Sequence, residues 1–355
     1  MRIQTNRLKQ SIYRLIDAAT NSRDFRKALL ERLREPLPFD AACCTTVDPN
    51  TLLSTGAVTE IGIEAIHDHL FEYEYLHEDF NKYELLVHED IPVAILSEAT
   101  AGELERSSRY REVLQPAGFA DEMRAALIYE EKCWGYLTLF RRQLFTEMER
   151  KLLNDLIPAI ASSLRTTSLF LPEDAVSRAG QGPGIMILSN ELKSFSANQA
   201  AVQWLALIQQ WENIDSKTMP RPIRAVCSRL LSQSLEDAVS SDVAKVSLCL
   251  PDLPCVTIRA SRLHGSVGSA EIAVLIQQAT PSEMLPMIAD AYGLTKREKE
   301  IISELITGAS TKELALTLHI STYTVQDHLK SIFAKTGVAS RRELIWRLFS
   351  RFGCV

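Results

Sequence analysis

Apolar side chains near the end of the chain recur every three or four positions, which is the spacing of one face of an α-helix. The pattern predicts four helices, over residues 295–308, 310–320, 321–337 and 340–352. Three of them open with the spacing of a capping box, namely Thr295 with Glu298, Ser310 with Glu313, and Ser340 with Glu343. Ser321 can cap the remaining helix, and Gly308 and Gly337 are placed to end two of the four. The last residues are therefore predicted to form an all-helical module.

The second and third of these helices are separated by only a few residues around Ile320 and Ser321. So short a connection favours a helix-turn-helix, which places its second helix in the major groove of DNA. One face of that helix is apolar, with Val325, Leu329, Ile332 and Phe333. We expect the opposite face to meet the groove; it carries Tyr323, Asp327, Lys330, Ser331 and Ala334, flanked by Thr324 and Gln326.

Residues 1–168 have a mixed pattern that begins with two amphipathic helices, around Leu8 to Ala19 and around Phe25 to Leu33. Apolar, β-branched and aromatic runs then predict strands, at residues 41–47, 52–58, 92–96, 123–129 and 133–140. Asp48-Pro49-Asn50 is a turn signal between the first two strands, and Glu130-Glu131-Lys132 connects the last two as a hairpin. A long helix over residues 145–165, with Pro158 inside it, closes the segment.

Residues 180–280 have a second mixed pattern, in which strand, turn and strand precede a helix that Asn198 is placed to start. Three antiparallel strands are then predicted, over residues 244–250, 255–263 and 269–279. Glycine and proline mark the junctions on both sides, at residues 180–184, Thr280-Pro281 and Pro286. We therefore predict domains over residues 1–168, 186–280 and 293–355, with linkers at 169–185 and 281–292.

Composition and charge support this division. The chain has 355 residues, enough for two to three domains of roughly 150 residues, and its 46% hydrophobic and 24% charged residues are ordinary for a globular protein. The formal net charge is −6, but residues 291–355 hold 10 basic against 6 acidic side chains, and the rest hold 29 against 39. The last segment is thus +4 and the body −10, as expected when only one end of a protein meets a polyanion.

The sequence also indicates the cellular setting. No apolar run approaches the roughly 18 to 20 residues that span a bilayer, and the first residues lack the apolar stretch and cleavage site of a signal peptide. We expect a cytoplasmic protein with no membrane partner. The 7 cysteines are an odd number without the spacing of a zinc site, so we expect free, buried thiols.

Candidate catalytic chemistry is sparse. The segment IHDHLFEYEYLHEDF gathers histidines and carboxylates, but His67 and His69 lie on different sides of a helix, so a solvated acidic helix is favoured over a metal site. Cys43 and Cys44 are neighbours in a predicted strand and point to opposite faces, which favours packing over redox sensing. The sequence contains no phosphate-binding loop, nucleophile elbow or zinc-protease motif. We expect no enzyme, no metal and no cofactor.

Residues 294–348 carry the motifs LTKRE, KELA, STYTV, HLK and RREL, and together these resemble the LuxR/NarL-type C-terminal helix-turn-helix. The resemblance implies that the base-reading residues are Gln326, Asp327 and Lys330. It implies phosphate contacts from Thr311, Lys312, Thr322, Thr324, His328 and Lys335, and a dimerisation helix that carries Leu344, Ile345, Leu348 and Phe349.

Asp327 departs from the general pattern of that family, because a carboxylate is poorly placed beside phosphates and can read only the amino group of a cytosine. Two other roles stay open for it. It can pair with Lys330 or Lys335, or it can discriminate against wrong sites by repulsion.

Weaker resemblances cover the rest of the chain. In residues 1–168 a hairpin, WGYL, the pattern RxxxFTxxE and the pattern LxPxIAxxL resemble a GAF domain, which implies a pocket between sheet and helices that senses a small molecule or a partner. In residues 186–280 the strand-strand-helix opening and the three-stranded ending resemble a PAS domain. The expected fold class is multidomain α+β, with a GAF-like α/β sensor, a PAS-like α+β domain and a C-terminal all-α four-helix helix-turn-helix.

The resulting hypothesis is a sequence-specific transcriptional regulator that binds double-stranded DNA as a homodimer, with RNA polymerase and a small-molecule effector as further candidate partners. A signal would alter how two protomers are held, through the helix ending near Leu164 and the last helix. In the main alternative, the GAF-like and PAS-like folds only support oligomerisation and protein contacts. A closed pocket of several hundred cubic ångströms would favour sensing, and a pocket filled by its own side chains would oppose it. A protein-binding helical bundle, a sigma-factor region and an enzyme with a DNA-binding tail are further alternatives.

Overall fold

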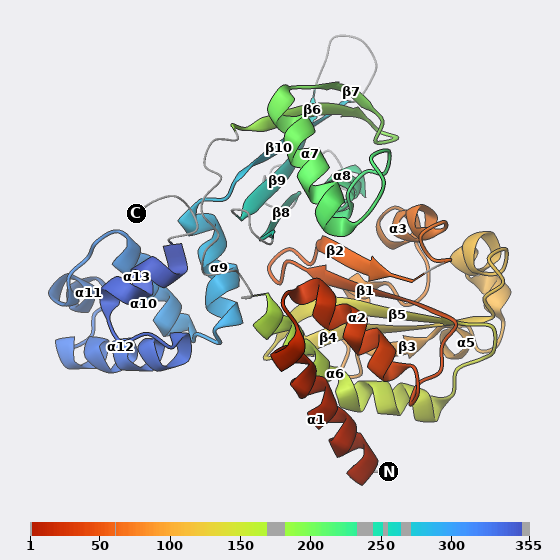
Figure 1. Cartoon of the computed structure of the whole chain (residues 1–355), viewed down its shortest axis with the longest axis horizontal. Coiled ribbons are helices and arrows are strands. Elements are labelled where there is room, and N and C mark those ends of the chain that lie inside the picture. The colour runs from red at the N-terminus through yellow and green to blue at the C-terminus, as the bar shows by residue number, and fades with distance from the viewer. Residues whose placement is uncertain are drawn as a thin grey trace.

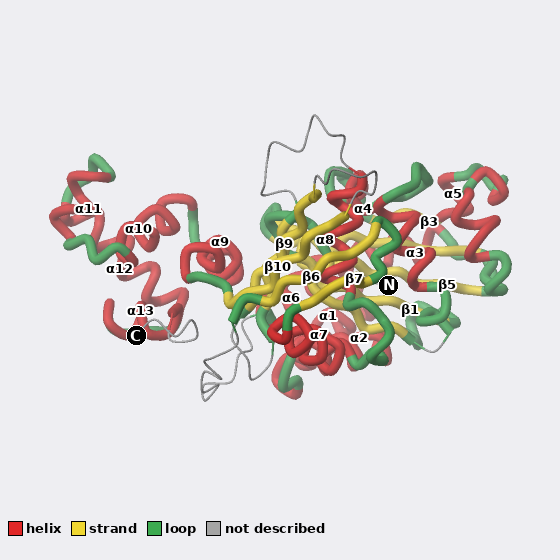
Figure 2. The backbone as a smooth tube through the Cα atoms, turned by 90° about the horizontal axis from the view of Figure 1, so that it is seen from above, coloured by secondary structure: helices red, strands yellow, loops and turns green. Residues whose placement is uncertain are grey.

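A computed structural model describes residues 2–60, 62–168, 182–232, 244–250, 255–263 and 271–349 of the chain. Two five-stranded sheets and a group of helices make up the molecule (Figure 1). Helix α9 (Pro281–Ala291) lies between the last four helices and the two sheets in both views (Figures 1 and 2). Within those ranges, no helix is both long enough and apolar enough to cross a membrane.

The N-terminal part has three layers around an antiparallel sheet of order β2-β1-β5-β4-β3. Helices α1, α2 and α6 pack on one face of the sheet and form the largest hydrophobic core of the molecule with it. Helices α3 to α5 and the short turns η1 and η2 pack on the other face. The elements are α1 (Arg2–Ala18), α2 (Ser22–Leu33), β1 (Ala41–Val47), β2 (Ser54–Thr59), α3 (His67–Tyr75), α4 (Tyr83–Leu86), β3 (Val93–Ile95), α5 (Leu96–Ala99), η1 (Leu104–Arg106), η2 (Tyr110–Leu114), β4 (Asp121–Tyr129), β5 (Lys132–Arg141) and α6 (Glu147–Thr167).

The strands predicted in this part are confirmed, and so is the hairpin between β4 and β5. Its turn residues Glu130 and Glu131 both have positive φ angles, of 50° and 62°, as a tight hairpin turn requires. Cys44 packs in the core beneath α2 and Cys43 in the core on the other face, which confirms that these neighbours point apart. Helix α6 contains Pro158 and buries Leu164 in the chain's own core, so this apolar face is not open to a second protomer.

The central part is a second antiparallel sheet of order β7-β6-β10-β9-β8. The two sheets have the same strand order. In each of them, the second strand along the chain lies at one edge and is followed across the sheet by the first, the fifth, the fourth and the third. Asn198 begins α7 as predicted, because its side-chain oxygen accepts a hydrogen bond of 2.8 Å from the backbone of Ala201. The elements are β6 (Gly184–Ser189), β7 (Ser194–Ala197), α7 (Gln199–Glu212), α8 (Arg221–Ser232), β8 (Lys245–Leu248), β9 (Val256–Leu263) and β10 (Glu271–Gln278).

Two expectations about connecting segments are changed. Residues 281–292 were expected to be a linker but form α9, because Thr280 makes a capping box with Glu283 and Pro281 occupies the first turn, where proline is tolerated. Strand β6 begins at Gly184, inside the linker predicted over residues 169–185; residues 169–181 lie outside the described ranges.

The expectation that all cysteines are free is wrong. Cys249 and Cys255 form a disulfide, because the antiparallel pairing of β8 with β9 brings the two side chains together. Cys43, Cys44, Cys133 and Cys227 are free and buried. Cys354 lies outside the described residues.

Helix α3 is also not the solvated acidic helix that its composition suggests. His67 and Phe71 are buried, because α3 packs against α8 of the central part. The sequence alone could not show this contact, since more than 150 residues separate the two helices. His69 lies on the exposed side of α3.

Candidate nucleic-acid interface

The C-terminal helices form one core together with α9. Apolar side chains from every helix of the module are buried there, among them Ile301, Leu314, Val325, Ile332 and Leu344. The elements are α10 (Lys296–Ile306), α11 (Thr311–Thr317), α12 (Thr322–Thr336) and α13 (Arg341–Phe349). The four predicted helices are thus confirmed up to Phe349, and residues 350–355 lie outside the described ranges.

Local chemistry fixes where these helices begin and end. The capping boxes of α10 and α11 form as predicted, at Thr295 and Ser310. The hydroxyl oxygen of Ser321 accepts a hydrogen bond of 3.0 Å from the backbone of Thr324 and so begins α12. Gly337 ends α12 in the left-handed conformation, at a φ of 66°. The turn between α11 and α12 spans residues 318–321, and the two helices pack together as a helix-turn-helix.

The face of α12 opposite its buried Val325 and Ile332 is open to solvent. All three predicted base-reading residues, Gln326, Asp327 and Lys330, are exposed on it. The Nζ atom of Lys330 lies 3.3 Å from the Oδ1 atom of Asp327, with 73% and 50% of the two side chains exposed. Asp327 therefore pairs with Lys330, which was one of the two roles left open for it, and such an exposed pair costs little to separate.

Most of the predicted phosphate contacts lie in the first turns of α11 and α12, where free backbone N–H groups favour an anion. Thr311 and Lys312 open α11, and Thr322 and Thr324 open α12. Lys312 and Thr322 are exposed, whereas Thr311 and Thr324 are half-buried. His328, one turn further along α12, is also half-buried.

The carboxylate of Glu298 changes what is expected of Ser331 and Lys335, which the sequence placed towards DNA. This buried carboxylate accepts hydrogen bonds of 2.7 Å from the Nζ atom of Lys335 and from the hydroxyl of Ser331. Burial alone would raise the pKa of Glu298, but these bonds and one from the backbone of Thr295 outweigh it and lower the pKa to about 2. Ser331 therefore points towards α10 and not to the groove-facing side, and Lys335 is held in an ion pair within the module.

Helix α13 places two of its predicted dimerisation residues inside the module. Leu344 and Leu348 are buried in the core that the module shares with α9, and Ile345 is half-buried against it. The side chain of Phe349 lies outside the described residues. Trp346, which the sequence analysis did not single out, is 52% exposed on the same helix.

The module is held against the N-terminal sheet through α9, a contact that the sequence did not indicate. The carboxylate of Asp290 pairs with Lys299 of α10, and its other oxygen lies 3.5 Å from the Nζ atom of Lys132 in β5. Arg165, near the end of α6, pairs with Glu130 at 2.6 Å beside this contact. A cavity of about 440 Å³ opens between the β4–β5 hairpin, α9 and α10.

A buried arginine of the central part also joins the two sheets to each other. Arg221 of α8 forms two hydrogen bonds of 2.8 Å with the carboxylate of Glu64 and donates one of 3.2 Å to the Nε2 atom of His67. Its NH1 atom lies 3.6 Å from the buried carboxylate of Glu212. Burial, with Arg221 and Arg224 nearby, keeps the pKa of His67 well below its usual value, so the ring is neutral.

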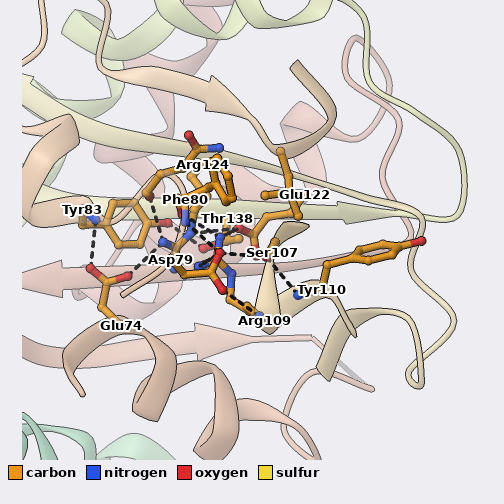
Figure 3. A network of polar contacts seen from close by, with 12 residues as sticks. Glu74, Asp79, Phe80, Tyr83, Ser107, Arg109, Tyr110, Glu122, Arg124 and Thr138 are labelled. Atoms are coloured by element: carbon orange, nitrogen blue, oxygen red, sulfur yellow. Dashed lines mark hydrogen bonds and ion pairs between the residues drawn. The ribbon is translucent and has the colours of Figure 1, made fainter. Parts of the chain in front are cut away.

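A small cavity lies in the N-terminal part where a GAF-type pocket is expected, between the sheet and α3 with α4. Its volume is about 60 Å³, because a network of charged and aromatic side chains fills the space (Figure 3). Arg124 binds Glu74 at 2.9 Å and Glu122 at 3.1 Å, and it lies over the ring of Tyr83. Figure 3 shows the network continuing through Arg109, whose NH2 atom lies 2.8 Å from Glu122. The cavity is well below the roughly 300 Å³ at which small-molecule pockets begin.

These features define the last part of the chain as a helix-turn-helix module. The family of bacterial regulatory proteins described as the luxR family matches residues 292–348. The spore germination protein GerE of Bacillus subtilis is 40% identical over 55 residues, which are 16% of this chain and 74% of that protein. The chain therefore belongs to the luxR family of bacterial regulatory proteins.

Other relatives share less of their length with this chain. The monoamine regulon transcriptional regulator of Klebsiella aerogenes is 37% identical over 107 residues, which are 30% of this chain and 43% of that regulator. The chain thus spans less than half the length of that relative. A solved structure of the VqmA dimer of Vibrio cholerae is similar to part of this chain, with 20% sequence identity and a TM-score of 0.20. The match covers 48% of this chain and 83% of the VqmA chain.

Proposed function

We propose that the protein is a sequence-specific DNA-binding transcriptional regulator, in which α12 reads bases in the major groove. The observation that carries this proposal is the exposed polar face of α12 on a well-packed helix-turn-helix, with Gln326 and Lys330 side by side on it. Lys330 suits a guanine, and Gln326 suits an adenine. Asp327 leaves its pair with Lys330 on binding, and then accepts from a cytosine or rejects other bases.

The phosphate contacts are proposed for the first turns of α11 and α12. Lys312 supplies an exposed cation, and Thr311, Thr322 and Thr324 can donate hydroxyl hydrogen bonds beside free backbone N–H groups. His328 lies one turn further along α12. Lys335 is a weaker candidate, because a phosphate would compete with the carboxylate of Glu298 for its ammonium group.

We propose that two copies bind neighbouring half-sites, about one helical turn of DNA apart. The burial of Leu344 and Leu348 within the module moves the proposed contact between copies to the outer side of α13. Trp346 is an exposed aromatic residue of this helix, and aromatic anchors are common at such contacts.

For the body, we propose GAF-like and PAS-like domains that act on the module through α9. Two antiparallel sheets with helices packed on them support this assignment. The 60 Å³ cavity of the N-terminal part favours the version in which this part is a platform for protein contacts. In the sensing version, cavities of about 440 Å³ beside α9 and about 580 Å³ between α1 and α6 both have the volume of a small-molecule pocket, and the first is the candidate effector site because it adjoins the helical module.

Replacing Lys330 with alanine tests the base-reading role. The free energy with which the full chain binds a selected operator should weaken by about 1–3 kcal/mol, whereas its free energy of binding to random DNA should stay the same. Fluorescence anisotropy at one fixed salt concentration measures both affinities. Lys151→Ala, an exposed lysine of α6, is the matched control and should change neither. An equal loss on both DNAs would make Lys330 a phosphate contact instead.

A further inference from the structure

The disulfide lies at the end of the central sheet. Cys249 directly follows β8 and Cys255 directly precedes β9. In that hairpin Leu248 pairs with Val256, so the two cysteines form the next pair of the antiparallel ladder. Oxidation therefore joins two side chains that the sheet already holds together, and reduction leaves two thiols as neighbours.

Cys255 belongs to the core of the helical module as well as to the sheet. Its side chain is only 1% exposed and packs in the same cluster as Met284 and Ile288 of α9. Its backbone oxygen accepts a hydrogen bond of 2.8 Å from Ala279, the residue just before the cap of α9. The disulfide thus borders the place where the chain passes from the last strand into α9.

The first turn of α9 rests on the same two strands. The carboxylate of Glu283 lies 2.6 Å from the NH2 atom of Arg259 in β9 and 3.6 Å from the Nζ atom of Lys245 in β8. Burial would raise the pKa of Glu283, but hydrogen bonds from Thr280 and Arg259 with the charge of Lys245 lower it to about 2. A covalent link between the ends of β8 and β9 therefore stiffens the surface that holds α9.

The other end of α9 contacts the N-terminal part. Ala291 packs in the N-terminal core, and Asp290 lies near Lys132. A cavity of about 70 Å³ adjoins this junction, lined by Trp134 and Leu164, by Met287 of α9, and by Cys249. The disulfide thus lies beside α9, and α9 packs against both the helical module and the N-terminal core.

Cys249 is also the accessible member of the pair. It is half-buried, whereas Cys255 is only 1% exposed, so the Sγ atom of Cys249 is the expected point of attack by a thiol from solvent. The four free cysteines within the described residues differ, because burial raises the pKa of each thiol; the pKa reaches about 12 for Cys44, Cys133 and Cys227. These thiols stay protonated and are poor nucleophiles.

We propose that Cys249 and Cys255 are a reversible thiol–disulfide modification site that controls how firmly α9 holds the helical module to the body. Its co-reactant is a low-molecular-weight thiol such as glutathione. The thiolate attacks the Sγ atom of Cys249, the bond to Cys255 breaks, and the Cys255 thiolate takes a proton. A second thiol attacks the mixed disulfide and releases Cys249, so two thiols become one external disulfide.

The regulatory consequence rests on the proposed function. A DNA-binding regulator works where glutathione keeps most thiols reduced, and disulfides found there are usually transient or redox-sensing. The oxidised state is the one in which α9 is fixed between the two sheets and the module. The reduced state loosens α9, and the module then moves more freely relative to the body.

Amide hydrogen exchange on the full-length protein in oxidised and reduced glutathione buffers tests this site. We expect faster exchange in α9 and in the ends of β8 and β9 after reduction, with unchanged exchange in β1 and β5. Differential alkylation with mass spectrometry should show Cys249 and Cys255 gaining label together, whereas Cys44 and Cys227 stay unlabelled. A pair that stays reduced in every buffer, or exchange that ignores its state, overturns the proposal.

Variants separate this inference from the proposed function. The double variant C249S/C255S should exchange like reduced wild-type protein in both buffers, and C227A should respond like wild type. Operator affinity is measured in parallel. If the operator is bound but α9 does not respond, the redox site is refuted and the proposed function stands. If α9 responds and no DNA is bound specifically, the proposed function fails and the site remains.

Discussion

At the scale of single residues, the buried carboxylate of Glu298 explains why Ser331 and Lys335 point towards α10. The sequence alone predicts that both side chains face DNA. The sequence predicted the capping role of Glu298 from the spacing to Thr295, and that contact is confirmed. Its bonds to Ser331 and Lys335 could not be predicted, because they join residues 33 and 37 positions apart. Periodicity tells which side of a helix a residue occupies, but not which neighbouring helix covers that side.

The variant Glu298→Gln should lower the free energy of unfolding at neutral pH by about 1–3 kcal/mol, because a buried, charged hydrogen-bond acceptor is lost. The pKa of Glu298 is lowered from 4.5 to about 2, so its contribution is complete above about pH 4.5 and is lost as the pH falls towards 2. Urea unfolding at several pH values measures the effect. The difference between variant and wild type should therefore shrink in acid.

Glu304→Gln, on the same helix, is the control and should change stability little, because no side-chain partner of Glu304 is found within the described residues. A Glu298→Gln variant as stable as wild type at neutral pH would contradict the role given to this carboxylate.

Local sequence signals predicted most helices and strands of the molecule. The helices that were missed depend on contacts with distant parts of the chain. The capped helices α10 to α12 and the strands of both sheets follow from side-chain spacing, turn residues and caps. Helix α8 was not predicted, because its buried arginines Arg221 and Arg224 have several of their partners in the N-terminal part, at Glu64, His67 and Asp68. Helix α9 was taken for a linker because its two prolines suggest a break. Both misses concern elements whose stability comes from other parts of the chain.

The packing of α3 on α8 should depend on pH through His67. Its neutral ring accepts a hydrogen bond from Arg221, and a protonated ring would lose that bond and face Arg221 and Arg224 as a third cation. Because the folded-state pKa lies well below the usual 6.5, this contact stabilises the protein fully above about pH 6.5 and less as the pH falls. Thermal unfolding followed from about pH 7 to about pH 5 should show the loss.

The variant His67→Gln, which keeps a hydrogen-bond acceptor, should reduce that pH dependence. His69→Gln on the exposed side of α3 should keep the wild-type dependence. If the two variants have the same pH dependence as wild type, the buried ring does not control this contact.

At the scale of the whole molecule, charge and composition predicted an acidic body with a net charge of −10 and a basic C-terminal module with a net charge of +4. The structure adds how the parts are joined. Arg221 ties the two sheets together, and α9 ties the module to both. Neither joint has a local sequence signal, since each depends on residues from distant segments meeting in the folded chain. The body is therefore coupled to the C-terminal module by direct contact.

The C-terminal module is proposed to read DNA sequence. The most direct test selects genomic fragments on the full-length protein and compares its affinity for the enriched motif with its affinity for random DNA over a range of salt concentrations. We predict a preference of about 10³-fold or more, with both affinities falling steeply as salt rises. Equal affinity for all fragments, or no binding by protein that is folded by circular dichroism, would contradict the account.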